Sequence, residues 1–323
     1  MKLTINNQKL LWQSMTRIRR TEEIIAERYR EQQMRCPTHL CIGQEAIPVG
    51  VSAALNADDM VFSNHRAHGH YLAKGGNLPA LIAELYGRSL GCCGGRGGSM
   101  HLIDISARFM GATPIVGGTV PLAVGTSWAS LLQGKKTISV AYFGDGCFEE
   151  GVMHESMNFA AAHSLPVLFV CENNGYAVYT GLDKRQPDRS IANIAHAHGW
   201  QTYSGDGNNV EEVTKIARQA ADNARQGNGP QFMEFSTFRW MEHCGPGNDD
   251  HLNYRPNGAL VSWQKRCPIA RLRRTLEALP NFEIGWFDQV TNEINYEIKQ
   301  AFEFALASPV ADEKSAGIHV YAE

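Results

Sequence analysis

TISVAYFGDGCFEEG at residues 137–151 and LPVLFVCENNGY at residues 165–176 carry the clearest structural signal in the sequence. Each opens with an apolar run, TISVAYF or LPVLFVC, typical of strands that are buried on both faces. The segment between them is helical to about His163, so a strand, a helix and a second strand are expected. Strands joined in this way run parallel, side by side, with a right-handed crossover. This βαβ unit predicts an α/β fold.

Both predicted strands end in polar residues and glycine. Gly144, Asp145 and Gly146 follow the first strand, and Asn174 lies in the NNGY that follows the second. The carboxyl ends of parallel strands meet at one edge, where open α/β sheets bind ligands. A carboxylate and an amide carbonyl suit Mg²⁺, which keeps its other positions for water and phosphate oxygens. Because the flanking glycines let backbone N–H groups approach an anion, the pair predicts a metal and phosphate site.

Other phosphate-binding motifs fit this region poorly. GDG alone occurs in many turns, and its pairing with NNGY across one crossover is what makes it informative. A dinucleotide fingerprint needs glycine where Glu149 stands, and GTSWASLLQGKKT lacks the spacing of a Walker loop. Both of those nucleotide sites are therefore excluded.

The rest of the sequence continues the alternation of helices and strands. An amphipathic helix is expected over about residues 8–33, with Arg17, Arg19 and Arg20 on its solvated face. Residues 37–125 are rich in glycine and histidine and weakly periodic, which predicts long functional loops. The later elements are a helix over 210–225, a strand in PQFMEFSTF, and closing helices over 269–279 and 290–306.

No linker divides the chain. We therefore predict a single domain over residues 1–323, with a mostly parallel sheet covered by helices and a C-terminal helical extension over about 262–323. A net charge of -3, from 30 basic and 33 acidic residues, argues against nucleic acid as a ligand. A mean hydropathy of -0.29 and the lack of a long apolar run argue against a membrane protein. Eight cysteines without a CxxC pair suit reduced thiols, so we expect a cytoplasmic location.

GDG followed one crossover later by NN resembles the thiamine diphosphate motif. The blocks HLCIGQEAIPVGV from His39, HRAHGHYLAKGG from His65, ELYGRSLGCCGGRGGSMH from Glu84 and PIVGGTVPLAVG from Pro114 are similar to those of the alpha subunits of 2-oxo acid and acetoin dehydrogenases. The resemblance covers roughly residues 10–260. It implies the phosphate-binding half of the thiamine diphosphate fold, with thiamine diphosphate and Mg²⁺ as cofactors.

The resemblance also assigns residues around the cofactor. Asp145, the Asn174 side chain and the Tyr176 carbonyl would bind the metal. The remaining cofactor contacts that it implies come from His65, Arg66, Val116, Gly144, Gly146 and Cys147, with the Arg66 fork suited to the diphosphate. Pro114 replaces a glycine that is common in the family. Pyruvate-type subunits usually have tyrosine at the position of His65, and the histidine here resembles acetoin-type subunits instead.

The same resemblance places His39 and His243 near the cofactor and the substrate as catalytic residues. His68 and His70 are left open between structural and functional roles. The histidines of HRAHGH could bind zinc, but the sequence nearby offers no acid or cysteine to complete a set of zinc ligands. Cys244 stands where regulated mitochondrial members carry a phosphorylated serine, so that switch is not expected.

The function implied is oxidative decarboxylation of a pyruvate-like 2-oxo acid and transfer of the acyl group to a lipoyl-bearing acyltransferase. The activating glutamate would come from a beta subunit, in an assembly of two alpha and two beta chains, since Glu45 in GQEA fits a structural role at a helix start. An acetoin dehydrogenase alpha subunit and a non-catalytic diphosphate-binding subunit are the alternatives. The loop RWMEHCGPGNDD departs from the family pattern and leaves the substrate open.

Overall fold

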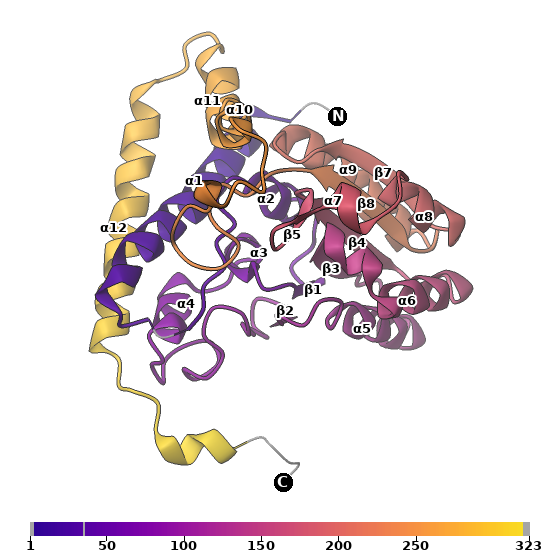
Figure 1. Ribbon diagram of the computed structural model, residues 1–323, viewed down its shortest axis with the longest axis horizontal. Helices are drawn as coiled ribbons and strands as arrows, with labels where there is room; N and C mark the ends of the chain where they lie inside the picture. Colours follow the sequence, from indigo (N-terminus) through magenta and orange to yellow (C-terminus); the bar gives the residue numbers. More distant parts are fainter. Residues whose placement is uncertain (1–2, 35, 319–323) are drawn as a thin grey trace.

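The computed structural model describes residues 3–34 and 36–318, so residues 319–323 of the expected C-terminal extension lie outside the described part. Its centre is a six-stranded parallel sheet in the order β2-β1-β3-β4-β8-β7, with helices on both faces (Figure 1). A small antiparallel ribbon, β5–β6, stands outside this sheet. The predicted fold class, a parallel α/β sheet covered by helices, is confirmed.

The strands are short, and the central ones are buried on both faces. They are β1 (Met60–Ser63), β2 (Phe109–Ala112), β3 (Ser139–Gly144), β4 (Val167–Asn173), β5 (Tyr176–Ala177), β6 (Thr180–Gly181), β7 (Gln201–Asp206) and β8 (Gln231–Ser236). Along β3, Val140 and Tyr142 enter one apolar core while Ala141 and Phe143 enter the other. Successive strand residues point to opposite faces, so a continuous apolar run supplies both cores at once.

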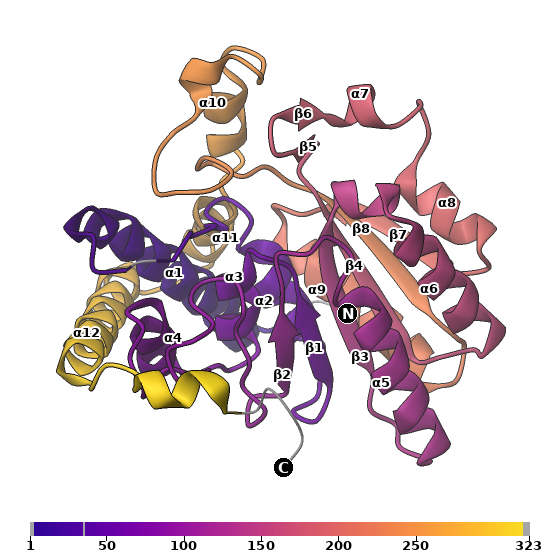
Figure 2. The same ribbon diagram turned by 60° about the horizontal axis from the view of Figure 1, so that its bottom comes forward.

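The helices form a layer on each face of the sheet. They are α1 (Ile5–Arg28), α2 (Ala46–Ser52), α3 (Ala67–Ala73), α4 (Leu78–Leu85), α5 (Val120–Leu132), α6 (Gly151–Ala162), α7 (Leu182–Arg185), α8 (Ile191–Ala197), α9 (Val210–Arg225), α10 (Ala259–Gln264), α11 (Pro268–Glu277) and α12 (Gly285–Ala307). Figure 2 shows α5, α6 and α8 on one side of the sheet, with α2, α3 and α9 on the other. The predicted helices over 210–225, 269–279 and 290–306 are confirmed as α9, α11 and α12.

The opening helix is confirmed in kind, but one of its arginines was placed wrongly by the sequence pattern. Arg19 is buried rather than solvated, and its Nε and Nη2 donate to the two carboxylate oxygens of Glu45 at 2.5 and 2.9 Å. Glu45 also accepts the Gly43 N–H at 2.9 Å, directly before α2. Glu45 therefore has the structural role expected of it. The amphipathic pattern of residues 8–33 could not show that Arg19 is drawn inside by the buried carboxylate of Glu45.

Residues 37–125 contain more regular structure than their composition predicts. Strands β1 and β2, helices α2, α3 and α4 and the start of α5 lie there. Outside this range, strand β7 was also not predicted. The glycine-rich stretch GCCGGRGGSMH folds around the carboxylate of Glu84, which accepts backbone N–H groups of Cys93, Gly95 and Gly97 at 2.8, 2.9 and 2.5 Å. That loop is held by an acidic residue of α4, the helix that precedes it.

The register of the two central strands sets the position of the site. Gly144 at the end of β3 pairs with Glu172 near the end of β4. Asp145 and the NNGY turn that contains Asn174 therefore leave the sheet side by side. Gly175 in that turn has a φ of 80°, a conformation that glycine adopts without strain.

Candidate active site

A cavity of about 370 Å³ lies at the carboxyl ends of β3 and β4. Its walls come from segments that are far apart in the chain: the loop before α2, the turn between β1 and α3, the loop before α5, both strand ends and the loop after β8. All the site residues named from the sequence line this cavity: His39, His65, Arg66, Val116, Gly144, Asp145, Gly146, Cys147, Asn174, Tyr176 and His243.

The acidic end of the cavity is formed by Asp145, which is only 1% exposed. Its carboxylate pairs with the guanidinium of Arg185 from α7. Burial raises the pKa of Asp145 above its ordinary value, and the charge of Arg185 opposes that rise. The Oδ1 of Asn174 accepts the Tyr176 N–H at 3.1 Å, while its Nδ2 donates to Oε1 of Gln44 at 3.3 Å. Amide and carboxylate oxygens are thus held at one edge of the sheet.

Three histidines gather in the lining of the same cavity. The ring centroids of His39 and His65 lie 4.7 Å apart, and those of His39 and His243 lie 5.2 Å apart. Burial, and then the charge of Arg66, lower the pKa of His39 to about 3 and that of His243 to about 4. The same causes hold the pKa of His65 well below its ordinary value. All three rings are therefore uncharged at neutral pH.

Arg66 organises this cluster. Its Nη1 donates to the Leu40 carbonyl at 3.0 Å, and its Nη2 contacts the carbonyl of His243 at 3.0 Å and the Nδ1 of His243 at 3.2 Å. Because a guanidinium only donates, Nδ1 of His243 accepts, and the proton of the neutral ring sits on Nε2. The family resemblance predicts that the Arg66 guanidinium binds a diphosphate. In this structure its Nη1 and Nη2 both contact protein atoms instead.

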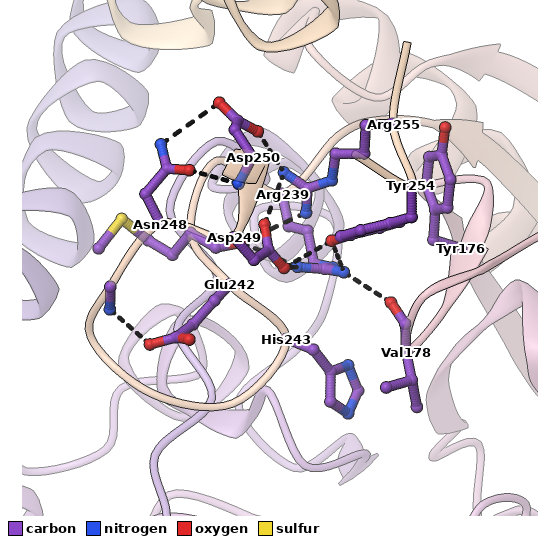
Figure 3. A network of polar contacts seen from close by, with 12 residues as sticks. Tyr176, Val178, Arg239, Glu242, His243, Asn248, Asp249, Asp250, Tyr254 and Arg255 are labelled. Carbon is purple, nitrogen blue, oxygen red and sulfur yellow. Dashed lines mark hydrogen bonds and ion pairs between the residues drawn. The ribbon is translucent and has the colours of Figure 1, made fainter. Parts of the chain in front are cut away.

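The loop that carries His243 is fixed by a buried polar network (Figure 3). Arg239 donates to Asp249 at 3.1 Å and to the Val178 carbonyl at 2.8 Å, and Tyr254 donates to Asp249 at 2.5 Å. Arg255 packs its guanidinium over the Tyr254 ring, 5.1 Å from the centroid. The atypical residues of RWMEHCGPGNDD therefore form an ordered loop that is tied at both ends.

This loop also packs on the segment before α2. Trp240 N–H donates to the Ile42 carbonyl at 2.9 Å, and Gly245 N–H donates to the Thr38 carbonyl at 2.8 Å. A Cβ on Gly43 would lie 2.4 Å from the Trp240 side chain, so that position needs glycine. These contacts bring His39 and His243 into one wall.

His68 and His70, which the sequence left open, lie behind the cavity and not on its lining. His68 contacts Glu22 at 3.2 Å and Ser99 at 2.8 Å. His70 contacts Ser63 at 2.7 Å and Glu172 at 3.2 Å, and its ring stacks on Tyr142. Both are fully hydrogen-bonded buried groups, so their role in this structure is structural.

Sequence reasoning missed several residues of the cavity and its rim. Gln44 lines the cavity, and its Nε2 has no hydrogen-bond partner among the described residues. Arg185 and Glu149 meet at the rim over Asp145. Gln44 stands inside a quoted family block and could have been found there, whereas Arg185 follows no motif.

None of the helices in the described ranges is long and apolar enough to cross a membrane.

A parallel sheet with a carboxylate, an amide and glycine-flanked backbone at its carboxyl edge is the architecture of α/β proteins that bind a ligand at their strand ends. Residues 13–314 match the family described as the dehydrogenase E1 component. The chain belongs to this family of oxidoreductases, as an alpha subunit. Membership implies a thiamine diphosphate cofactor and a beta-subunit partner.

Individual relatives carry two activities in their names. The chain is 34% identical over 322 residues to the alpha subunit of acetoin:2,6-dichlorophenolindophenol oxidoreductase from Bacillus subtilis, covering 99% of this chain and 95% of that protein. It is 35% identical over 308 residues to the pyruvate dehydrogenase E1 alpha subunit of Zymomonas mobilis, with 94% and 85% covered. For the Rhizobium meliloti pyruvate dehydrogenase E1 alpha subunit the identity is 33% over 307 residues, with 93% and 86% covered.

Proposed function

We propose that this chain, with a beta subunit, holds thiamine diphosphate through Mg²⁺ and cleaves a pyruvate-like 2-oxo acid, whose acyl group passes to a lipoyl-bearing acyltransferase. The observation that carries the proposal is that Asp145 and Asn174, from neighbouring strand ends, line the same cavity as a cluster of three uncharged histidines. A cytoplasmic location, with two alpha and two beta chains, belongs to the same proposal.

The residues present fit such a cofactor. The Asp145 carboxylate, the Asn174 Oδ1 and the Tyr176 carbonyl supply the oxygen ligands that Mg²⁺ prefers. Gly146 and Cys147 would offer backbone N–H groups to the diphosphate, and a Cβ on Gly146 would lie 3.1 Å from Ala177, which favours glycine there. Two buried polar atoms of lining residues, the Gln44 Nε2 and the His39 Nδ1, have no hydrogen-bond partner among the described residues, which supports a polar ligand here.

Thiamine diphosphate, when bound, supplies an electron sink for the carbanion left when a bond beside the substrate carbonyl breaks. The chain's own part is to position and to transfer protons. His243, neutral and with its proton on Nε2, can donate a hydrogen bond to a carbonyl oxygen. The Nδ1 of the neutral His39 has no hydrogen-bond partner in the described part of the chain, so this ring can accept or donate a hydrogen bond.

A second candidate substrate is acetoin. His65 adds a third neutral imidazole, and the Arg66 guanidinium beside these rings is engaged by protein atoms. Uncharged donors and acceptors suit the carbonyl and hydroxyl groups of a neutral hydroxyketone, whereas a 2-oxo acid carboxylate gains more from a free cation. The Bacillus subtilis relative, named for acetoin, supports the same alternative.

The beta subunit fits the exposed face of α5. Leu122, Trp128 and Leu132 on this helix are 57%, 39% and 72% exposed, and Thr119 and Val120 at its start line the cavity. Such an apolar face is unusual for a surface that meets only water. A partner docked there would lie beside the cofactor cavity, where it could present its activating glutamate.

The test is a dye-reduction assay with a panel of 2-oxo acids and acetoin, using this chain co-expressed with its beta partner. We expect turnover with a 2-oxo acid only when both chains are present. Turnover with acetoin but with none of the 2-oxo acids would favour the second candidate substrate. Turnover by the isolated chain would contradict the need for a beta subunit. No turnover with any substrate, despite cofactor binding, would indicate the non-catalytic subunit.

The metal assignment has its own test. Asp145→Ala should abolish Mg²⁺-dependent binding of thiamine diphosphate, measured by calorimetry, without unfolding the chain. Asp183→Ala is the control, since Asp183 lies in the same region and is solvent-exposed. Equal affinity in the Asp145 variant and the wild type would remove Asp145 from the metal site.

A further inference from the structure

The segment after β4 forms an arm over the acidic end of the cavity. Figure 2 shows β5, β6 and α7 rising from the end of β4, away from the body of the sheet. The arm returns to the cavity through the side chain of Arg185, the last residue of α7. The Arg185 side chain is only 9% exposed although α7 lies at the surface.

Arg185 makes a full set of contacts at the strand end. Its Nη2 pairs with Oδ2 of Asp145 and its Nη1 with Oε1 of Glu149. Its Nε donates to the Thr180 carbonyl at 3.0 Å. Gln186 supports this arrangement, because its Nε2 donates to Oε1 of Glu149 at 2.9 Å and to the Asp145 carbonyl at 3.3 Å.

The neighbouring Lys184 shows that this arrangement is specific to one side chain. Lys184 carries the same charge on the same short helix, yet it is 76% exposed, and its one ion pair among the described residues is with Asp183, which is 73% exposed. A buried carboxylate such as Asp145 is costly without a cation beside it. Arg185 supplies that cation from within the chain.

We infer that Arg185 is an internal counter-ion that occupies the Asp145 carboxylate until a divalent cation replaces it. Arg185 is thus a positioning residue: it sets the affinity of the site for the cation and ties the position of the α7 arm to cofactor loading. The inference rests on the proposed function, which makes Asp145 a metal ligand. Glu149, at the rim and less buried than Asp145, gives the displaced guanidinium a remaining partner.

The sign of the effect follows from linkage. Arg185 stabilises the cation-free state, because there it neutralises Asp145, and it contributes less once a metal ion carries that charge. A group that stabilises only one of two states lowers the affinity for the ligand that selects the other state. Removal of the guanidinium should therefore strengthen cation binding and weaken the cation-free fold.

The experiment compares Arg185→Met with Lys184→Met, which removes the same charge one residue away. Binding of Mn²⁺ is followed by electron paramagnetic resonance, with Mn²⁺ alone and with Mn²⁺ plus thiamine diphosphate. We expect Arg185→Met to bind Mn²⁺ on the order of tenfold more tightly than the wild type in both arms, within the usual range of coupling between sites. Lys184→Met should bind as the wild type does.

Thermal unfolding gives a readout independent of activity. Without metal, the Tm of Arg185→Met should be lower than that of Lys184→Met, and the Tm increase on adding Mn²⁺ should be larger. Arg185→Lys, which keeps the charge without the fork, should fall between the wild type and Arg185→Met, and it serves as the milder change if Arg185→Met folds poorly.

The outcomes separate the two levels of inference. Mn²⁺ affinity in Arg185→Met equal to the wild type overturns the counter-ion role. Affinity that falls only when thiamine diphosphate is present also overturns it and makes Arg185 a diphosphate ligand. If Asp145→Ala binds Mn²⁺ as well as the wild type, the metal-ligand assignment of the proposed function is itself wrong, whatever Arg185 does.

Discussion

Buried charges at single residues decide much of this structure. Asp145, Arg66 and Arg239 are each almost completely buried, and each has a partner within the chain. A buried ion pair adds little net stability, yet removing one member leaves the other uncompensated in a low-dielectric environment. Substitutions at such residues should therefore have large effects, and their exposed neighbours should serve as controls.

Arg19 offers the clearest stability prediction at this scale. Arg19→Met leaves the buried Glu45 carboxylate with the Gly43 N–H as its one remaining partner among the described residues, and we expect the free energy of unfolding to fall by about 3–5 kcal/mol. Arg17→Met breaks the partly exposed pair with Glu297 and should cost less than about 1 kcal/mol. Urea unfolding of the two variants checks the contrast, and similar losses would contradict it.

Acid should destabilise the fold in part through His243. Burial, and then Arg66, lower its pKa from 6.5 to about 4, so the unfolded ring takes up a proton over this range while the folded ring does not. The free energy of unfolding therefore decreases as the pH falls from 6.5 towards about 4. His243→Gln removes this contribution, which is below about 1.4 kcal/mol per pH unit because the ring is partly exposed.

Urea unfolding at about pH 7 and about pH 5 measures the difference for His243→Gln. His101→Gln, which removes an exposed histidine outside the cavity lining, is the control substitution. A pH dependence that is identical in His243→Gln and the wild type would argue against the neutral buried ring.

At the scale of elements, the local sequence pattern predicted the long helices and the apolar strands. It missed short strands and strands at an edge of the sheet. The helices over 210–225, 269–279 and 290–306 were found from their periodicity. Strand β7 is an edge strand whose residues QTYSGD are mostly half-exposed, so no apolar run marks it. Strands β1 and β2 have four residues each and form because β3 and its neighbours pair with them.

The same limit applies to the site. Strand ends and family blocks predicted eleven residues that do share one cavity, because parallel strands bring their carboxyl ends together. Arg185 and the buried pairing of Arg19 depend on tertiary contacts between segments with no common motif. Such pairings are absent from any local pattern.

The 239–255 loop yields a prediction at this scale. Asp249→Asn removes the charge that holds Arg239 and Arg255, so backbone amides of the loop should exchange hydrogen faster while those of β8 stay protected. Asp250→Asn, at a position with a 45% exposed side chain, should change little. Hydrogen–deuterium exchange by mass spectrometry measures both, and unchanged protection in Asp249→Asn would show that the network does not anchor the loop.

For the whole molecule, the exposed apolar face of α5 is the feature that points beyond the single chain. Leu122→Glu should prevent association with the beta subunit while leaving the Tm unchanged, because the side chain is 57% exposed in the free chain. Leu10→Glu changes a similarly exposed residue, 62% exposed, on α1 and should preserve association. Co-purification of the tagged chain with its partner is the measurement; normal recovery with Leu122→Glu would move the interface elsewhere.

The packing of α1 against α12 has a consequence for synthesis on the ribosome. Trp12 contacts Phe287 with ring centroids 4.8 Å apart, so the first helix is buried by the last long one (Figure 1). At translation rates of about 5–20 residues per second, the nascent α1 waits on the order of 15–50 s for that partner to be made. Helices α2, α3 and α11 also pack on α1 and are made earlier, so it is the part of α1 around Trp12 covered by α12 that stays open to chaperones, and a ribosome that stops before α12 releases a chain with that part uncovered.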